Sequence, residues 1–150
     1  MQFPTARVPP TARYHDDMDT IPLGTSGERR ILVTPEETTN FLGNEKARVL
    51  STPHMIAFME WTSRDALKPL LPEGWDSVGT VVNIRHLAAT PTGMSVTFRA
   101  RVTGVEGNRV TFAVEAHDEK ELIGEGVHER FIVDVNRFAT RLAMKKESGR

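Results

Sequence analysis

The chain has 150 residues, a formal net charge of -1 and no cysteine. That length fits one domain with a core of its own, and the near-neutral charge offers no basic surface for nucleic acid. The lack of cysteine excludes disulfides, thiol catalysis and thiolate metal sites, and it suits a reducing compartment. The first residues lack the apolar core of a signal peptide, and no apolar run approaches the ~20 residues of a membrane helix. We therefore expect a cytoplasmic protein that binds neither nucleic acid nor membranes.

The N-terminal residues differ in composition from the rest of the chain. Residues 1–26 are predicted to form a mobile extension, because prolines and scattered charges dominate its first part. The domain is then expected to cover residues 27–150. Its first strand is predicted over residues 27–34, and residues 36–48 read as a loop or a short irregular helix.

The segment over residues 54–70 is predicted to be the main helix. Thr52 suits the N-cap, and Pro53 needs no hydrogen-bond partner at the first helical position. The first half of the segment is apolar on all sides apart from Glu60, which indicates an enclosed helix. Two prolines stop it near residue 70.

Residues after Asp76 alternate between apolar and polar side chains. This period of two predicts strands, separated by turns near residues 104–108 and 118–121, with the last strand over 122–135. One strand, a buried helix and four further strands joined mostly by short turns describe an antiparallel sheet wrapped around one helix. The predicted class is α+β.

Three side chains supply the groups that hydrolyse an ester or thioester: a hydroxyl, a carboxylate and an imidazole. They are Thr52, Glu60 and His86. Each also has a structural interpretation: Thr52 as a helix cap, Glu60 as a carboxylate paired with an arginine or the backbone, and His86 as a packing residue at a strand end. Histidines 54, 117 and 128 are too widely spaced for a metal signature, so no metal site is expected.

Three segments resemble the fluoroacetyl-CoA thioesterases, a family with the hot-dog fold. They are Ser51–Trp61 (STPHMIAFMEW), Val78–Gly93 (VGTVVNIRHLAATPTG) and Gly124–Val133 (GEGVHERFIV). The resemblance implies a sheet around one long central helix. It also implies a homodimer in which each active site lies at the subunit boundary.

The same resemblance assigns roles to five residues. It places Thr52, Glu60 and His86 in the catalytic set, and Gly79 and Arg130 at the substrate, where the backbone N–H of Gly79 would meet the acyl carbonyl. The implied reaction hydrolyses a small acyl-CoA or related acyl thioester to free acid and thiol. No cofactor or metal ion is implied, and coenzyme A enters only as part of the substrate.

One part of the chain departs from the family pattern. Phenylalanines that form a lid upstream of the family's threonine are replaced near Gly43 and Lys46, and only Phe41 is aromatic there. The predicted catalytic residues match the family pattern, whereas the segment that would determine acyl specificity does not. The acyl group therefore stays open, as does the choice between coenzyme A and an acyl-carrier protein, and between Glu60 as general base or as nucleophile.

Two other functions remain alternatives at this stage. A non-catalytic module that binds acyl thioesters would keep the pocket without needing Glu60 or His86. An enoyl-thioester hydratase usually shows a DxNPxHxD-like run, which is absent here. Arg85, Arg99 and Arg101 fit either the phosphates of coenzyme A or an ordinary solvated strand face.

Overall fold

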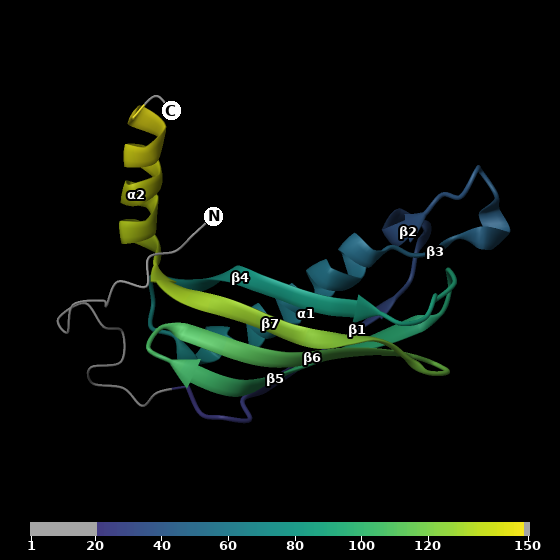
Figure 1. Cartoon of the computed structure of the whole chain (residues 1–150), viewed down its shortest axis with the longest axis horizontal. Helices are drawn as coiled ribbons and strands as arrows, with labels where there is room; N and C mark the ends of the chain where they lie inside the picture. The colour runs from purple at the N-terminus through teal and green to yellow at the C-terminus, as the bar shows by residue number, and fades with distance from the viewer. Residues whose placement is uncertain (1–20, 149–150) are drawn as a thin grey trace.

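The computed structural model describes residues 21–148. Most of the expected extension, residues 1–20, lies outside the described residues. A five-stranded antiparallel sheet curves around helix α1 (Thr52–Leu67) (Figure 1). In spatial order the strands are β1 (Ser26–Leu32), β5 (Ser95–Glu106), β6 (Arg109–Asp118), β7 (Leu122–Asp134) and β4 (Trp75–His86). The predicted α+β class, with one sheet around one helix, is confirmed.

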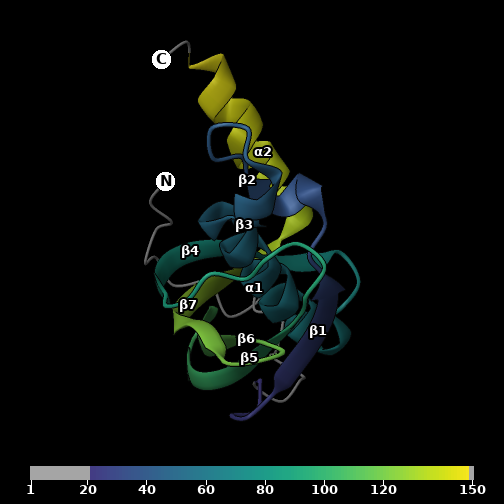
Figure 2. The ribbon, with the colours of Figure 1, turned by 90° about the vertical axis from the view of Figure 1, so that its right-hand side faces the viewer.

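The remaining elements are short, apart from a second helix. They are the 3₁₀ turns η2 (Pro35–Glu37), η3 (Glu45–Ala47) and η4 (Lys68–Leu70), the two-residue strands β2 (Thr38–Thr39) and β3 (Val49–Leu50), and helix α2 (Val135–Glu147). Strands β2 and β3 pair with each other, and they stand apart from the main sheet in Figure 2.

The core lies between α1 and the inward face of the sheet. Alternate residues of β5 and β6 are buried, as the period of two predicted. The aromatic rings of Phe58 on α1 and Phe98 on β5 have centroids 5.3 Å apart. The fully or nearly fully buried apolar side chains include Met55, Met59, Leu67, Val96, Phe98, Val102, Val110, Phe112, Ile123 and Ile132.

Helix α1 begins differently from the prediction. The N-cap is Ser51, whose Oγ accepts the backbone N–H of His54 at 3.2 Å, and Thr52 is the first helical residue. The prediction of Thr52 as the cap was wrong, because the preceding serine satisfies the orphan N–H first. The hydroxyl of Thr52 is therefore available for another partner.

The prediction of an enclosed helix holds on one side of α1 only. Met55 and Met59 face the sheet and are buried, whereas Trp61 is 46% exposed. The side chain of Glu60 is 36% exposed. Within residues 21–148, this side of α1 is therefore only partly covered.

Both ends of the described chain contain structure beyond the elements expected from the sequence. At the start, Ile21 is 3% exposed and the N–H of Gly24 bonds the carbonyl of Val102 at 2.8 Å, so the chain contacts the sheet before β1 begins. At the end, Asp134 caps α2 by accepting the N–H groups of Asn136 and Arg137. Helix α2 rises from the β4 side of the sheet (Figure 1). No helix among residues 21–148 is long and apolar enough to span a membrane.

Candidate active site

The first turn of α1 meets the last residue of β4. Oγ1 of Thr52 and Nδ1 of His86 lie 2.7 Å apart, a short hydrogen bond between residues 34 positions apart in sequence. When the imidazole is neutral and carries its proton on Nε2, the Thr52 hydroxyl donates to Nδ1. The structure thus brings two of the three predicted catalytic residues together.

The surroundings of His86 favour the neutral imidazole. Burial lowers the pKa of His86 below its ordinary value, and a backbone hydrogen bond with Ala88 opposes that shift. Nε2 of His86 is buried and has no hydrogen-bond partner among the described residues. A buried ring nitrogen without a partner is costly, so this atom is suited to meet a group from outside the chain.

A groove of about 350 Å³ lies over this pair. Its walls come from the end of β4 and the three residues after it, from the start of α1, and from the β2–β3 region. The lining residues include Thr39, Phe41, Val49, Thr52, His86 and Leu87. Phe41, the aromatic residue of the departing segment, is therefore beside the Thr52–His86 pair.

The third predicted catalytic residue, Glu60, faces Gly79 in the middle of β4. A Cβ built on Gly79 would stand 2.6 Å from Oε2 of Glu60 and 3.1 Å from Cε1 of His128. Any larger residue at position 79 would displace the carboxylate. Gly79 therefore gives Glu60 its place against the strand.

Arg130 on β7 forms an ion pair with Glu60, with Nη1 3.6 Å from Oε2. Arg130 is 5% exposed, and its Nε and Nη2 donate to the hydroxyl and carbonyl oxygens of Ser77 at 2.7 and 2.8 Å. Burial lowers the pKa of Arg130 and the charge of Glu60 opposes that shift. These contacts to Ser77 and Glu60 hold the guanidinium of Arg130 in place.

His128 completes this buried cluster. Its Nδ1 lies 2.8 Å from the carbonyl oxygen of Val81, and its Nε2 lies 3.1 Å from Nη1 of Arg130. The neutral tautomer with the proton on Nδ1 satisfies both contacts, since Nε2 then accepts from Arg130. Burial lowers the pKa of His128, in keeping with that neutral form.

Sequence reasoning ranked His128 low and did not single out Ser77. Ser77 is the one buried residue of β4, and His128 is buried on β7 together with Ile123 and Ile132. A polar residue within the period-two pattern of β7 was the available signal for His128. Their roles depend on the register that puts Ser77 beside Ile132 and Val82 beside His128. That register cannot be read from the two strands separately.

The two clusters are separate within one chain. Thr52 and Glu60 are eight residues apart on α1, a rise of about 12 Å. Gly79 and His86 are seven residues apart on β4, about 23 Å of extended strand. One chain therefore pairs Thr52 with His86, and Glu60 with Arg130, without bringing the carboxylate to the imidazole.

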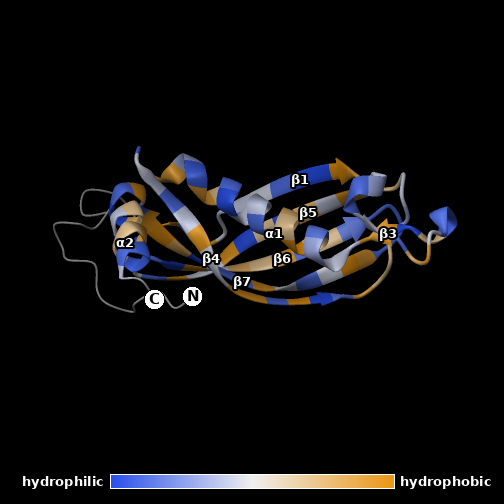
Figure 3. Cartoon of the chain, turned by 90° about the horizontal axis from the view of Figure 1, so that it is seen from above, coloured by the Kyte–Doolittle hydropathy of each residue, from blue (hydrophilic) through white to orange (hydrophobic). Residues whose placement is uncertain are grey.

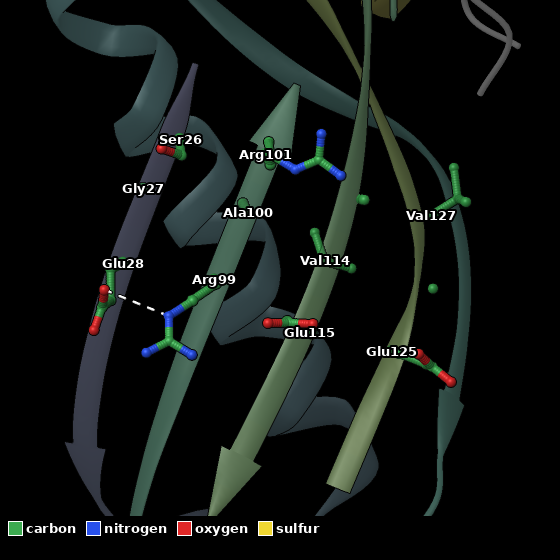
Figure 4. Close-up of a pocket in the computed structure, with 12 residues that line it drawn as sticks. Ser26, Gly27, Glu28, Arg99, Ala100, Arg101, Val114, Glu115, Glu125 and Val127 are labelled. Atoms are coloured by element: carbon green, nitrogen blue, oxygen red, sulfur yellow. Dashed lines mark ion pairs between the residues drawn. The ribbon is translucent and has the colours of Figure 1, made fainter. Parts of the chain in front are cut away.

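A larger hollow of about 610 Å³ lies on the outer face of the sheet, away from α1 (Figure 4). Arg99 and Arg101 line it together with Glu28, Glu115 and Glu125. Nε of Arg99 is 3.5 Å from Glu28, and Arg99 is paired across the strands with Glu115. These carboxylates offset the arginines, so the surface is mixed in charge and includes none of the predicted catalytic residues.

Comparison with known proteins connects this geometry with a family. The fluoroacetyl-CoA-specific thioesterase family matches residues 33–136. The chain belongs to this family. A curated relative, the fluoroacetyl-CoA thioesterase of Streptantibioticus cattleyicolor, is 36% identical over 124 residues, which cover 79% of this chain and 89% of the relative.

Solved structures agree with the family match. A thioesterase superfamily member from Thermus thermophilus has a TM-score of 0.78 and 36% identity, covering 87% of this chain and 97% of its own. A variant of the fluoroacetyl-CoA thioesterase, solved with fluoroacetate and CoA, has a TM-score of 0.72 and 35% identity, covering 79% and 99%. The hot-dog fold expected from the sequence is confirmed. The family member described here is a thioesterase, a hydrolase of acyl-CoA thioesters.

Proposed function

We propose that this thioesterase hydrolyses small acyl-CoA substrates with Thr52, Glu60 and His86 as its catalytic residues. The observation that carries the proposal is the 2.7 Å contact between Thr52 and His86 at the wall of a groove. A cap or packing role explains neither residue, because Ser51 caps the helix and Nε2 of His86 has no partner in the described chain.

The proposal includes a homodimer in which each active site draws on both protomers. Strand β4 is an edge strand of 12 residues, and Val81 and Val82 in its middle are 40% and 45% exposed. A long apolar edge is a ready surface for pairing with another strand.

Antiparallel pairing of two β4 strands about a two-fold axis would join the separate clusters. The strands then run in opposite directions, so the His86 end of one β4 lies beside the Gly79 half of the other. Glu60 of one protomer thereby approaches the Thr52–His86 pair of its partner. This arrangement supplies the missing third group, which one chain alone holds too far away.

The chemistry follows from the groups so assembled. Glu60 takes a proton from water, and the resulting hydroxide oxygen attacks the thioester carbonyl carbon. The backbone N–H of Gly79 stabilises the oxyanion of the tetrahedral intermediate. Collapse breaks the C–S bond, and the departing thiolate receives a proton through His86, leaving free acid and thiol. Thr52 fixes the orientation of the imidazole by its hydrogen bond to Nδ1.

Arg130 acts in this proposal by holding Glu60. Its buried guanidinium keeps a positive charge beside the carboxylate and fixes the carboxylate above Gly79. The Ser77 and His128 contacts in turn fix Arg130. Coenzyme A is the proposed thiol carrier, by analogy with the CoA-bound structure of the relative, and a cytoplasmic location fits the lack of cysteines.

A hydrolysis screen with released thiol as the readout tests the proposed function. Acetyl-, butyryl- and an aromatic acyl-CoA are compared with an acyl-carrier-protein thioester. We expect turnover of the CoA substrates, and a fall of roughly 10²–10⁴-fold in Glu60→Gln, the usual effect of losing an acid–base group. Equal turnover by wild type and Glu60→Gln would contradict the assignment. Faster turnover of the carrier-protein substrate would change the proposed carrier.

A further inference from the structure

A buried hydroxyl group that the proposed mechanism does not use lies close to the groove. Thr90 comes four residues after His86 in the chain and is 0% exposed. Its Oγ1 donates a hydrogen bond to Oδ2 of Asp118 at 2.9 Å. Because a buried hydroxyl without a partner is costly, this bond fixes the side chain of Thr90 against the end of β6.

Asp118 is well suited to serve as a fixed point. It is the last residue of β6, and its Oδ1 accepts the backbone N–H groups of Lys120 and Glu121 at 2.8 and 2.9 Å. Burial raises the pKa of Asp118, but the hydrogen bonds from Lys120, Glu121 and Thr90 outweigh burial and lower it. The carboxylate is therefore charged at neutral pH, and a hydrogen bond to a charged acceptor is stronger than one between neutral groups.

The backbone of Thr90 contacts the opposite wall of the groove. Its carbonyl oxygen accepts the N–H of Leu50 at 2.8 Å. Leu50 is 1% exposed and ends β3, two residues before Thr52. The next residue, Pro91, forms an isolated bridge with Val49. Thr90 thus joins the end of β6 to the strand that leads into α1, at the end of the molecule opposite α2 (Figure 3).

The wall that carries His86 is attached to the same hairpin. The N–H of Leu87 donates to the carbonyl oxygen of Ile123 at 2.7 Å. Ile123 is 0% exposed and is the second residue of β7, just after the turn that Asp118 begins. The β6–β7 hairpin therefore holds both walls, one through Leu87 and the other through Thr90.

The contact between the two walls depends on this support. Oγ1 of Thr52 and Nδ1 of His86 come from different elements, and a hydrogen bond of 2.7 Å weakens steeply when its atoms move apart. We propose that Thr90 and Asp118 are positioning residues that hold Thr52 against His86. The expected effect on turnover rests on the proposed function, in which this pair is catalytic.

Two substitutions of Thr90 separate the hydroxyl from the shape of the side chain. Thr90→Val keeps the shape and removes the hydroxyl, whereas Thr90→Ser keeps the hydroxyl. We expect kcat of Thr90→Val to fall at least about tenfold with KM close to wild type, because a displaced Thr52 no longer orients the imidazole of His86. Thr90→Ser should recover most of the wild-type kcat.

Asn108→Ala is the matched control for a loss of stability. Asn108 is 7% exposed, and its side chain donates to the carbonyl oxygen of Ile132 at 3.0 Å. It lies just before the first residue of β6, whereas Asp118 is the last. Its removal costs a buried hydrogen bond far from the groove, so we expect a lower Tm and an unchanged kcat.

The nitrogen NMR signal of Nδ1 in His86 reports the contact without reference to catalysis. Thr52→Val provides the reference, since it has no hydroxyl to donate. We expect the signal in Thr90→Val to move toward that reference, and the signals in Thr90→Ser and Asn108→Ala to stay at the wild-type position. Asp118→Asn is a second variant that should move the signal in the same direction. Its amide oxygen still accepts the N–H groups of the turn, while its NH₂ group replaces the acceptor of Thr90.

The two measurements together separate this inference from the proposed function. A wild-type His86 signal in Thr90→Val and Asp118→Asn would overturn the inference, whatever their activity. An equal loss of kcat in Thr90→Val and Asn108→Ala would also overturn it, because general destabilisation would then be the cause. A signal that moves together with a fall in kcat supports it. A signal that moves while kcat stays at wild type supports the positioning and contradicts the catalytic role of Thr52 and His86.

Discussion

Oε2 of Glu60 lies 2.6 Å from the point where a side chain at position 79 would begin. The carboxylate of Glu60 on the helix therefore fills the space that a side chain at position 79 on the strand would need. Glycine at this position needs no unusual backbone angle, because its φ is not in the left-handed region. The space above this position is occupied by the Glu60 carboxylate and, at 3.1 Å, by Cε1 of His128.

Gly79→Ala is expected to lower turnover without unfolding the protein. The added methyl group would push away the end of a flexible glutamate, so we expect at least a tenfold fall in kcat from the misplaced catalytic group. Gly104→Ala is the control, because the nearest atom to its new Cβ is 3.7 Å away, an ordinary contact. Steady-state kinetics and thermal unfolding of both variants make the comparison. Similar kcat values for the two would show that the position of Glu60 is unimportant.

Thr52→Val is expected to affect catalysis more than stability. Valine keeps the shape of threonine and loses the hydroxyl that bonds His86. Ser51→Ala should do the reverse, since losing an N-cap costs about 1 kcal/mol of stability while the Thr52–His86 pair stays intact. Urea unfolding and kcat are measured for both. If the Thr52→Val enzyme keeps the wild-type kcat and loses stability, the role of Thr52 is structural and the prediction is contradicted.

Stability is expected to fall as the pH drops below about 6.5, the pKa of histidine in an unfolded chain. Burial lowers the pKa of His128 in the fold, so at mildly acid pH the unfolded state binds more protons than the native state. Three charged groups also affect the pKa of His128: Arg130 lowers it, and Glu60 and Glu129 raise it. The pKa of His86 is lowered as well, so His86 contributes in the same direction.

The contribution of His128 is measured by replacing it with a residue that does not titrate. We expect Tm to change less between pH 7 and pH 5 in His128→Gln than in wild type. His117→Gln is the control, since its ring pairs with Glu115 on the outer face of the sheet. If the control flattens the pH dependence as much as His128→Gln does, the buried cluster is not its source.

Acyl specificity is expected to be broad. In the segment that departs from the resemblance, Gly43 has no side chain and Lys46 is an exposed charge. A small group in an apolar site is worth only about 1–3 kcal/mol, and a dry, closely shaped pocket is needed to obtain it. We predict no large preference for fluoroacetyl- over acetyl-CoA in kcat/KM, and tolerance of butyryl-CoA. A preference beyond about 10³-fold would mean that Phe41 or another element closes the pocket.

The sequence was sufficient for the sheet and for the central helix, because periodicity reports which side of an element is buried. It did not predict α2, although Asp134 before an amphipathic segment is an N-cap signal. The resemblance grouped Thr52, Glu60 and His86 as one catalytic set. Their spacing already implied that Glu60 lies apart from Thr52, because eight residues of helix are about 12 Å. The Ser77–Arg130–His128 contacts depend on strand register, which only the folded chain reveals.

Mixing two inactive variants tests most directly whether Glu60 acts with the Thr52–His86 pair of the other protomer. Glu60→Gln and His86→Ala chains are co-expressed, so that mixed dimers form beside the two parent dimers. In a mixed dimer one site carries both substitutions and the other carries neither, so the sample should recover about a quarter of wild-type kcat. If each site instead used Glu60 and His86 of the same chain, every site in the mixture would carry one substitution. Activity no higher than that of the parent variants would then contradict the shared site.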